Sequence, residues 1–174
     1  KKGTFRSINI PKFDKSIDDR CKKNSWFKLK KKPDILILEG WCVGARAEGS
    51  RSLNRPINVL EKSADKKKIW RSYVNNQLKS KYSKLFDQLD SLLYLKAKNF
   101  KLLKRWRLKQ EKKLKMKSGT KKNSKIMNEK EVETFMMTYQ RITQNMFKNA
   151  PKYSSAVIDL NENHQIKKVK FKHA

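Results

Sequence analysis

A single acidic residue follows the most apolar run of the chain. Residues 33–41 read P-D-I-L-I-L-E-G-W, so four branched apolar residues lie between a proline and Glu39. Such an unbroken run is typical of a parallel strand buried on both faces, and a side chain at its carboxyl end faces the crevice where α/β proteins bind ligands. A carboxylate there could hold magnesium or its water shell, or it could merely cap the following loop. Both interpretations of Glu39 stay open.

Two arginines lie where a lysine-dense region begins. Arg105 and Arg107 fall on a predicted helix, and residues 109–125 then contain eight lysines in seventeen positions and one glycine. We interpret residues 105–127 as a basic, lid-like lobe whose guanidinium groups could make bidentate contacts with phosphates. A helix face exposed to solvent explains the same pattern.

A third group of charges lies near the start of the chain. Residues 13–20 read F-D-K-S-I-D-D-R, with three carboxylates and two cations in eight positions. In a binding loop, Lys15 or Arg20 could meet an anionic substrate while Asp14 or Asp18 orients it. An ordinary surface turn with internal ion pairs would have the same composition.

The elements that would position these residues alternate between strands and helices. Apolar runs predict strands at 35–38, 91–95 and 156–160, and a short strand at 8–10. Helical spacing predicts helices from Asp65 to about 86, from Asn99 to about 114, and from Asn128, with Glu131 completing a capping box, to a stop before Pro151. The apolar stripe of the first helix is most simply core, and 39–65 reads as a long loop. This order predicts an α/β protein with a mainly parallel sheet.

Composition sets limits on the class of protein. The 174 residues, 37% of them hydrophobic, suffice for one domain. The formal charge of +29 comes from 36 Lys and 9 Arg spread along the chain, which suits either a lysine-rich solvated surface or a nucleic-acid-binding protein. Non-specific binding of polyanions at low salt is expected in both cases. The lysine-dense region has no aromatic residue for base stacking, and no zinc finger or RNP1-like pattern is present.

Other classes of site and segment are absent from the sequence. Cys21, Cys42, His164 and His173 lack the spacing of a zinc site. No run has the length of a membrane span and no signal peptide opens the chain, so we expect a cytoplasmic protein with no membrane partner. The phosphate-binding pattern G-x-x-x-x-G-K-[ST] does not occur. Because the chain begins with Lys1, we interpret its amino terminus as missing.

Six blocks, in order, carry a resemblance to a known family. They are P-K-F-D-K-S-I-D-D-R (11–20) with Trp26, L-E-G-W-C-V-G (38–44), P-I-N-V-L-E (56–61), W-R-S-Y (70–73), W-R-L-K-Q-E-K-K-L (106–114) and F-M-M-T-Y-Q-R-I-T (135–143). Together they resemble the D-glycerate 3-kinase family and its bacterial kinase-like relatives. The similarity runs from about residue 11 to about residue 165.

The resemblance implies a P-loop kinase fold with three layers, related to uridine kinase and phosphoribulokinase. Such enzymes use ATP and Mg²⁺ to phosphorylate a small hydroxylated acceptor, here a hydroxy acid or sugar-like molecule. The resemblance would place Glu39 at the Walker B position, indirectly on magnesium through water, and the helix 105–111 near the phosphate-covering lid. Residues 14–20 would form an acceptor-side loop. The family's Walker A loop precedes the part seen here.

Three functions from different classes follow. The leading one is the carboxyl-terminal portion of an ATP-dependent small-molecule kinase, a single domain whose 174 residues would not catalyse alone. The others are a basic nucleic-acid-binding protein and a catalytically dead kinase remnant that acts as a binding partner. If the strand carrying the phosphate-binding loop is missing, strand 35–38 should have unpaired edges, and the isolated chain should aggregate or be only partly ordered.

Overall fold

The computed structural model describes residues 5–14, 17–118 and 126–172. The chain divides into two compact units. One comprises Lys1–Glu39 with Lys109–Asn128, and the other comprises Gly40–Leu108 with Glu129–Ala174. Within the described residues, no helix is both long enough and apolar enough to cross a bilayer.

The first unit contains two small antiparallel ladders. Strand β1 (Ile8–Ile10) pairs with β4 (Phe27–Leu29), and β2 (Phe13–Asp14) pairs with β3 (Asp19–Arg20). A 3₁₀ turn, η1 (Lys23–Ser25), precedes Trp26, whose indole N–H donates to the carbonyl of Cys21 at 2.9 Å. The predicted short strand at 8–10 is therefore confirmed.

The predicted strand at 35–38 does not form. These residues have no regular secondary structure, and Ile35, Leu36 and Ile37 are 80%, 84% and 84% exposed. A strand requires a neighbour that supplies N–H and C=O partners, and none of the described residues pairs with this segment. The apolar run is therefore left exposed and without a partner strand among the described residues.

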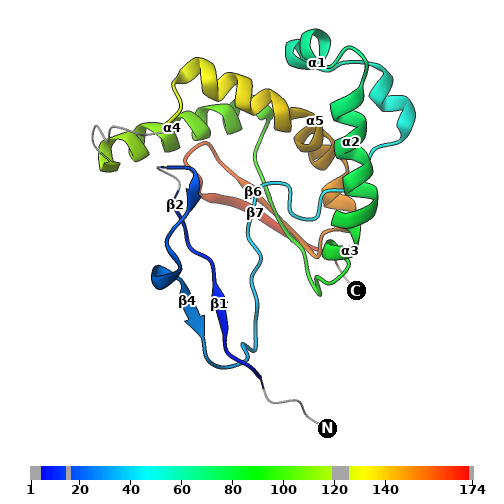
Figure 1. Ribbon diagram of the computed structural model, residues 1–174. Helices are drawn as coiled ribbons and strands as arrows, with labels where there is room; N and C mark the ends of the chain where they lie inside the picture. The colour runs from blue at the N-terminus through cyan, green and yellow to red at the C-terminus, as the bar shows by residue number, and fades with distance from the viewer. Residues whose placement is uncertain (1–4, 15–16, 119–125, 173–174) are drawn as a thin grey trace. The chain divides into compact units, whose positions relative to one another are not determined.

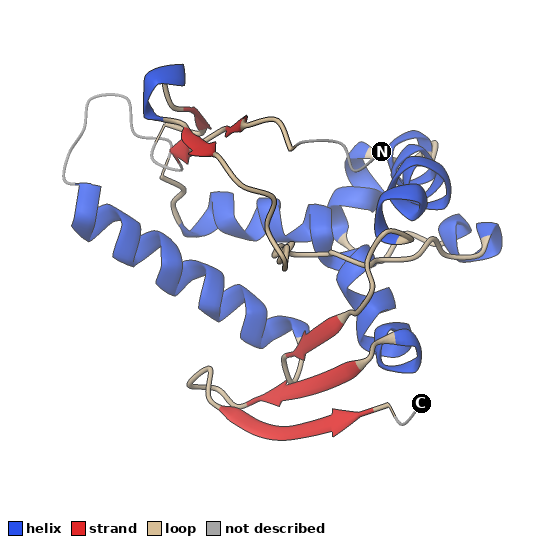
Figure 2. Cartoon of the chain, turned by 90° about the horizontal axis from the view of Figure 1, so that it is seen from below, coloured by secondary structure: helices blue, strands red, loops and turns tan. Residues whose placement is uncertain are grey.

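The second unit is built on a sheet of β5 (Leu93–Lys96), β6 (Ala156–Leu160) and β7 (Ile166–Phe171), in that order (Figure 2). β5 and β6 are parallel, and β6 and β7 form an antiparallel hairpin. The predicted strands at 91–95 and 156–160 are confirmed as β5 and β6. β7 was not predicted, although its alternation of apolar residues with lysines is a typical edge-strand pattern.

Three short helical elements lie in the region predicted as a long loop and just after it. They are η2 (Ser50–Asn54), α1 (Val59–Ala64) and α2 (Ile69–Gln77). Helix α1 was missed, although Asn58 and Glu61 form a capping pair: the Asn58 side chain accepts from the backbone N–H of Glu61 at 2.9 Å. Helix α2 continues through a π-helical turn, η3 (Leu78–Tyr82), into α3 (Ser83–Phe86), so the predicted helix is present in pieces.

The apolar stripe of α2 is not core. Arg71 and Asn75 are its buried residues, whereas Trp70 is 68% exposed and Ile69 and Tyr73 are also exposed. Hydrogen bonds decide which face turns inward, because the carboxylate of Asp65 accepts from the backbone N–H groups of Trp70 and Arg71 at 3.0 and 3.1 Å. Asp65 thus binds the first turn of the helix, although α2 begins later than predicted, at Ile69 with Lys68 in the N-cap position. The ion pair of Asp65 with Arg71 draws the polar face inward.

Two long helices complete the chain. In α4 (Phe100–Ser118), Asn99 accepts from the N–H of Leu102 at 2.9 Å, as its predicted capping role requires. The helix carries the expected lid-like lobe as far as Ser118, and residues 119–125 lie outside the described residues. Helix α5 (Glu129–Tyr153) continues past Pro151, so the predicted stop was wrong. A proline so close to the end of a helix disturbs only the last turn.

The core of the second unit lies between α5 and the sheet (Figure 1). Its buried residues come from the turn before η2, from η3, from both parallel strand partners and from α5: Ala45, Leu78, Tyr94, Met146, Ala150 and Val157. The N-terminal half of α5 adds Val132 and Met136, which are almost fully buried. Helix α5 is therefore the element on which the second unit is organised.

Candidate functional site

Glu39 is the last residue of the amino-terminal segment of the first unit, and it is exposed. Its carboxylate makes no hydrogen bond or ion pair with any residue that the structure describes. It is therefore available to a ligand, although the strand that was expected to present it is not formed. Mg²⁺ typically takes one or two protein carboxylates and completes its shell with water and substrate phosphates, so a single free carboxylate fits this ion.

A tight turn follows Glu39. Cys42 and Gly44 both have positive φ, at +72° and +76°, and the N–H of Ala45 donates to the carbonyl of Cys42 at 3.1 Å. A Cβ at Gly44 would lie 2.7 Å from a methyl group of Leu92. Glycine is therefore required at this position by conformation and by space.

The thiol of Cys42 is not suited to nucleophilic chemistry. Burial raises the pKa of Cys42 to about 12, and a hydrogen bond with Thr143 lowers it only in part. Because the thiolate is the reactive form, Cys42 stays protonated and inert at neutral pH. Its role is to pack beside the core.

Aromatic side chains link this turn to Arg107 within the second unit. Trp41 stacks on Tyr139 with ring centroids 5.0 Å apart, and Tyr139 packs against Phe135 at 5.1 Å. The guanidinium carbon of Arg107 lies 5.3 Å from the centroid of the Phe135 ring. A cation is thus held at the end of an aromatic row that begins two residues after Glu39.

Arg105 points elsewhere. Its guanidinium donates to the carboxylate of Glu162, in the turn between β6 and β7, at 2.7 Å. This hydrogen bond and the charge of Arg105 lower the pKa of Glu162. Residues two apart on an α-helix lie about 200° apart around its axis. The structure therefore separates the two arginines that the sequence grouped together.

The charged segment 13–20 forms a hairpin. Asp14 lies opposite Asp19 and Phe13 opposite Arg20 in the β2–β3 ladder, while Asp18 occupies the connecting turn with φ of +53°. The structure thus brings Asp14, Asp18 and Arg20 close together in the first unit. Lys15 lies outside the described residues.

The most elaborate polar cluster is one that sequence reasoning missed. Arg141, on α5, donates to both carboxylate oxygens of Glu61 at 2.8 and 2.7 Å and to Glu48 at 3.1 Å. It also donates to the carbonyls of Ser52 and Arg55 at 3.3 and 2.8 Å. The Arg141 side chain is only 10% exposed. One guanidinium therefore fastens α1 and the segment before it to α5.

A second buried ion pair lies beside the first. Arg71 Nη1 donates to the Asp65 carboxylate at 3.1 Å and to the Asp65 carbonyl at 2.7 Å, and Arg71 Nε donates to the carbonyl of Leu53 at 2.8 Å. Asn75 binds both the N–H and the carbonyl of Glu48, at 2.8 and 3.0 Å. Helix α2 is thus joined to the same segment as α5.

Charge pairing governs the protonation states in this cluster. Burial alone would raise the pKa of Glu61, but hydrogen bonds from Arg141 and from the N–H of Ile57, with the charges of Arg141 and Arg71, bring the pKa below its ordinary value. Burial likewise opposes a lowered pKa for Asp65, and the N–H groups of Trp70 and Arg71 prevail. The hydrogen bond with Glu61 raises the pKa of Arg141. Both carboxylates are therefore ionised at neutral pH.

A signal for this cluster was present in the sequence. Glu61, Arg71 and Arg141 belong to three of the six blocks that resemble the D-glycerate 3-kinase family, P-I-N-V-L-E, W-R-S-Y and F-M-M-T-Y-Q-R-I-T. These blocks are far apart in the chain, and the structure brings their charged residues together.

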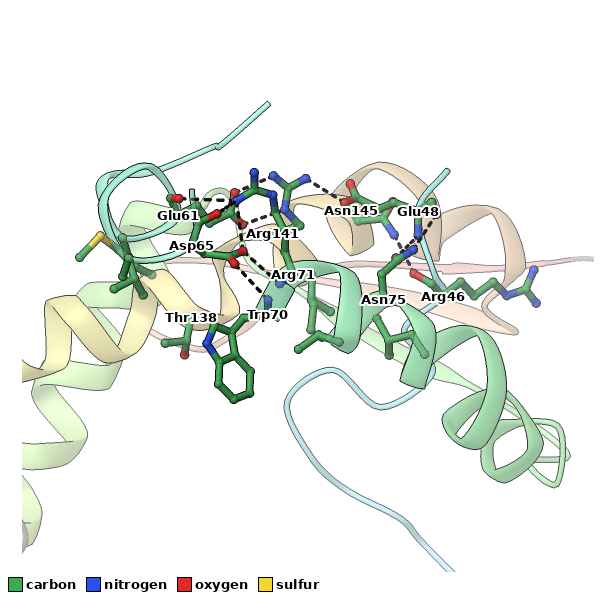
Figure 3. A pocket seen from close by; sticks show the side chains of 16 residues that line it. Arg46, Glu48, Glu61, Asp65, Trp70, Arg71, Asn75, Thr138, Arg141 and Asn145 are labelled. Atoms are coloured by element: carbon green, nitrogen blue, oxygen red, sulfur yellow. Dashed lines mark hydrogen bonds and ion pairs between the residues drawn. The ribbon is translucent and has the colours of Figure 1, made fainter. Parts of the chain in front are cut away.

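A cavity of about 390 Å³ adjoins the cluster, between α1, α2 and α5 (Figure 3). Apolar walls come from Leu60, Val74 and Ile142, and Trp70 lies at its edge. Arg71 and Arg141 also line the cavity, but both are engaged with carboxylates. A third cation of the lining, Arg46, lies over the ring of Tyr153, 3.9 Å from its centroid.

No group of three or more His, Cys, Asp or Glu residues with the geometry of a metal site occurs in the described parts of the chain. The candidate machinery therefore consists of separate pieces. They are Glu39 with the following turn, Arg107 with its aromatic row, and the acidic hairpin of β2 and β3.

Comparisons with known proteins give this arrangement a context. No family model matches the chain. It is 32% identical over 144 residues to an uncharacterized kinase of Schizosaccharomyces pombe, mug58, and the match covers 79% of this chain and 49% of that kinase. The fold matches a D-glycerate 3-kinase from Cryptococcus neoformans var. grubii with a TM-score of 0.68 at 22% identity, over 95% of this chain and 60% of that protein.

A further solved structure, titled as that of the YGR205w protein, matches with a TM-score of 0.62 at 26% identity, over 94% of this chain and 57% of that protein. The chain therefore spans between 49% and 60% of the length of these relatives. The comparisons confirm the resemblance to the D-glycerate 3-kinase family and its kinase-like relatives, and with it the α/β, P-loop kinase-like fold class.

Proposed function

We propose that this chain is the carboxyl-terminal portion of an ATP-dependent kinase that transfers the γ-phosphate of ATP to a small hydroxylated acceptor, with D-glycerate as the first candidate. The observation that carries the proposal is a match in fold over nearly the whole chain to a D-glycerate 3-kinase, together with 32% identity to a kinase. In this proposal the 174 residues belong to one catalytic domain.

Phosphoryl transfer depends on holding the phosphates, placing magnesium and neutralising developing charge. Glu39 would act on magnesium through its water shell, as the free and exposed state of its carboxylate supports. Magnesium would neutralise charge on the phosphates when bound. Arg107 would lie over the phosphates, and its place over the Phe135 ring, at the end of the aromatic row that begins at Trp41, supports this role.

The remaining predicted residues have less direct support. Arg105 would have to exchange Glu162 for a phosphate in order to act at the lid, which its exposed position permits. Asp14, Asp18 and Arg20, with Lys15, would form the acceptor-side loop, and the β2–β3 ladder that brings the first three close together supports this role.

The phosphate cradle is the missing part. The chain has no G-x-x-x-x-G-K-[ST] loop, so we expect these 174 residues alone to be inactive. In the intact kinase the loop would follow the strand that pairs with the exposed run at 35–38.

The first experiment reads the DNA upstream of the codon for Lys1. We expect an open frame encoding a strand followed by G-x-x-x-x-G-K-[ST]. The full-length protein is then assayed with Mg-ATP and a panel of acceptors that contains D-glycerate, L-glycerate and small sugars. A start codon near Lys1 without such a loop would overturn the kinase proposal and favour a catalytic remnant.

The charge of +29 favours a second activity, non-specific binding of polyanions. Filter binding of single-stranded RNA between 50 and 200 mM salt tests it, since neutralisation of several phosphates makes affinity fall steeply with salt. Affinity that does not change with salt would exclude this electrostatic mode.

Location of the protein in the cytoplasm also remains a prediction.

A further inference from the structure

The turn between β6 and β7 makes a set of contacts with α4, and of these the proposed chemistry involves only the ion pair of Arg105 with Glu162. Trp106 donates its indole N–H to the carbonyl of Glu162 at 2.9 Å, and its ring stacks on His164 with centroids 4.1 Å apart. Arg105 adds an ion pair to the Glu162 carboxylate at 2.7 Å. Two consecutive residues of α4 thus bind one turn through three different interactions.

The turn itself is held rigidly. The side-chain oxygen of Asn161 accepts from the N–H groups of Asn163 and Gln165, both at 2.9 Å. Its side-chain nitrogen donates to the Gln165 side chain at 3.0 Å, and its backbone N–H donates to the Gln165 carbonyl at 2.9 Å. His164 has φ of +64°, a conformation that is unfavourable for a residue with a side chain unless its surroundings impose it. Asn161 therefore fixes the shape that presents Glu162 and His164 to α4.

The other side of α4 faces α5. Lys104 Nζ lies 2.6 Å from the carboxylate of Glu133, and Arg107 lies over the ring of Phe135. Because Arg105 and Arg107 are about 200° apart around the helix, contact with the hairpin and contact with α5 are made by opposite faces. Rotation of α4 about its axis would break both sets of contacts together.

We propose that the β6–β7 turn, residues 161–165, is an anchor that sets the rotation of α4 and thereby positions Arg107 over the aromatic row on α5. Trp106 is the central positioning residue and Asn161 is the residue that shapes the anchor. The inference rests on the proposed function, because it gives Arg107 its purpose as the phosphate-directed cation of the kinase.

The anchor is tested first by hydrogen exchange on the full-length protein. The variants are Trp106→Phe, which loses the indole N–H but keeps an aromatic ring, and Asn161→Ala, which releases the turn. The matched control is Asn163→Ala, an exposed residue of the same turn. We expect backbone amides of residues 100–108 to exchange about tenfold faster in both variants, with α5 unchanged and the control equal to wild type. Unchanged exchange in both variants would overturn the anchor.

Positioning of Arg107 is tested in the full-length kinase. Trp106→Phe should lower kcat about tenfold while the KM for the acceptor changes less than twofold, since a displaced charge acts mainly on the transition state. In an Arg107→Ala background the same change should have no further effect. An equal loss of kcat in both backgrounds would show that Trp106 does not act through Arg107, and would overturn the positioning role.

The two proposals fail in distinguishable ways. Absence of kinase activity in the wild-type full-length protein would overturn the proposed function and with it the phosphate-directed role of Arg107. Hydrogen exchange would still decide whether the turn holds α4.

Discussion

Replacement of Arg141 by methionine tests the structural reasoning at its most demanding point. Arg141 makes five hydrogen bonds, and three of them go to the carboxylates of Glu48 and Glu61. Methionine keeps much of the volume and removes the charge. Two carboxylates would then remain with side chains only 21% and 12% exposed and without their cation.

The magnitude follows from the cost of an uncompensated buried charge. Removing one partner of a buried ion pair typically costs about 3–5 kcal/mol. At 1.36 kcal/mol for each factor of ten, the folding equilibrium should shift by about 10²–10⁴-fold. The matched control is Lys104→Met, which breaks a pair whose side chains are 31% and 55% exposed. A pair so exposed contributes about 0–1 kcal/mol.

The assay is urea unfolding followed by tryptophan fluorescence, at pH 7 and at pH 4.5. In the wild type the pKa of Glu61 is lowered from 4.5, so its stabilisation is fully present above pH 4.5 and is lost as pH falls through the lower folded-state value. In the variant the hydrogen bonds and the charge of Arg141 are lost, so the pKa of Glu61 is higher than in the wild type, and protonation as the pH falls relieves the unpaired charge. The difference between the two proteins should therefore shrink at pH 4.5.

Two results would refute this reasoning. One is a loss below about 1 kcal/mol at pH 7, which would place the Arg141 cluster among weak surface pairs. The other is a large loss that does not change between pH 7 and pH 4.5, which would show that packing rather than charge is responsible.

Further predictions concern the turn, the thiols and the exposed apolar run. Gly44→Ala should lower the free energy of unfolding by about 1–3 kcal/mol in the same assay, because φ at this position is +76°. The control Gly49→Ala should be nearly neutral, since a Cβ there would meet no atom within 4 Å. Equal effects of the two substitutions would contradict the turn geometry. In the native chain, a thiol reagent at pH 8 should modify Cys21 and leave Cys42 unmodified, because the pKa of Cys42 is raised to about 12. Cys42 should react once urea is added. Rapid reaction of two thiols per native chain would contradict the burial of Cys42. The isolated chain should self-associate, and Ile37→Lys should reduce the oligomeric fraction seen in size-exclusion chromatography. A monomeric wild-type chain with a sharp cooperative melt would contradict this prediction.

Local patterns were sufficient for some elements. Strand β6 was predicted at its observed bounds because a short apolar run between turn residues pairs in nearly any α/β context. Helix α5 followed from a long apolar stripe with a capping box at its start. The failure at 35–38 has a different cause, because a strand depends on a partner that the local sequence does not reveal.

Helix α2 shows a second limit. Periodicity located the helix but did not identify its inward face, since aromatic and apolar side chains on one side suggested core. The carboxylate of Asp65 and the backbone of Glu48 instead bind Arg71 and Asn75, and these partners can be recognised only in three dimensions.

The site shows the same division between local and distant information. The separation of Arg105 and Arg107 could have been predicted from their spacing on a helix. The Arg141 cluster could not, because its partners Glu61 and Glu48 lie 80 and 93 positions away in the chain. In the sequence, only the blocks that resemble the D-glycerate 3-kinase family indicated that these segments belong together.

The central claim is that this chain supplies the magnesium-directed acid of a kinase, and one measurement tests it most directly. The full-length protein and its Glu39→Gln variant are compared for Mg-ATP-dependent phosphorylation of the accepted substrate, with Glu129→Gln as a control at an exposed carboxylate outside the proposed chemistry. We predict that Glu39→Gln lowers kcat about 10²-fold or more while the fold, measured by its melt, is unchanged. Equal kcat for Glu39→Gln and wild type would contradict the account.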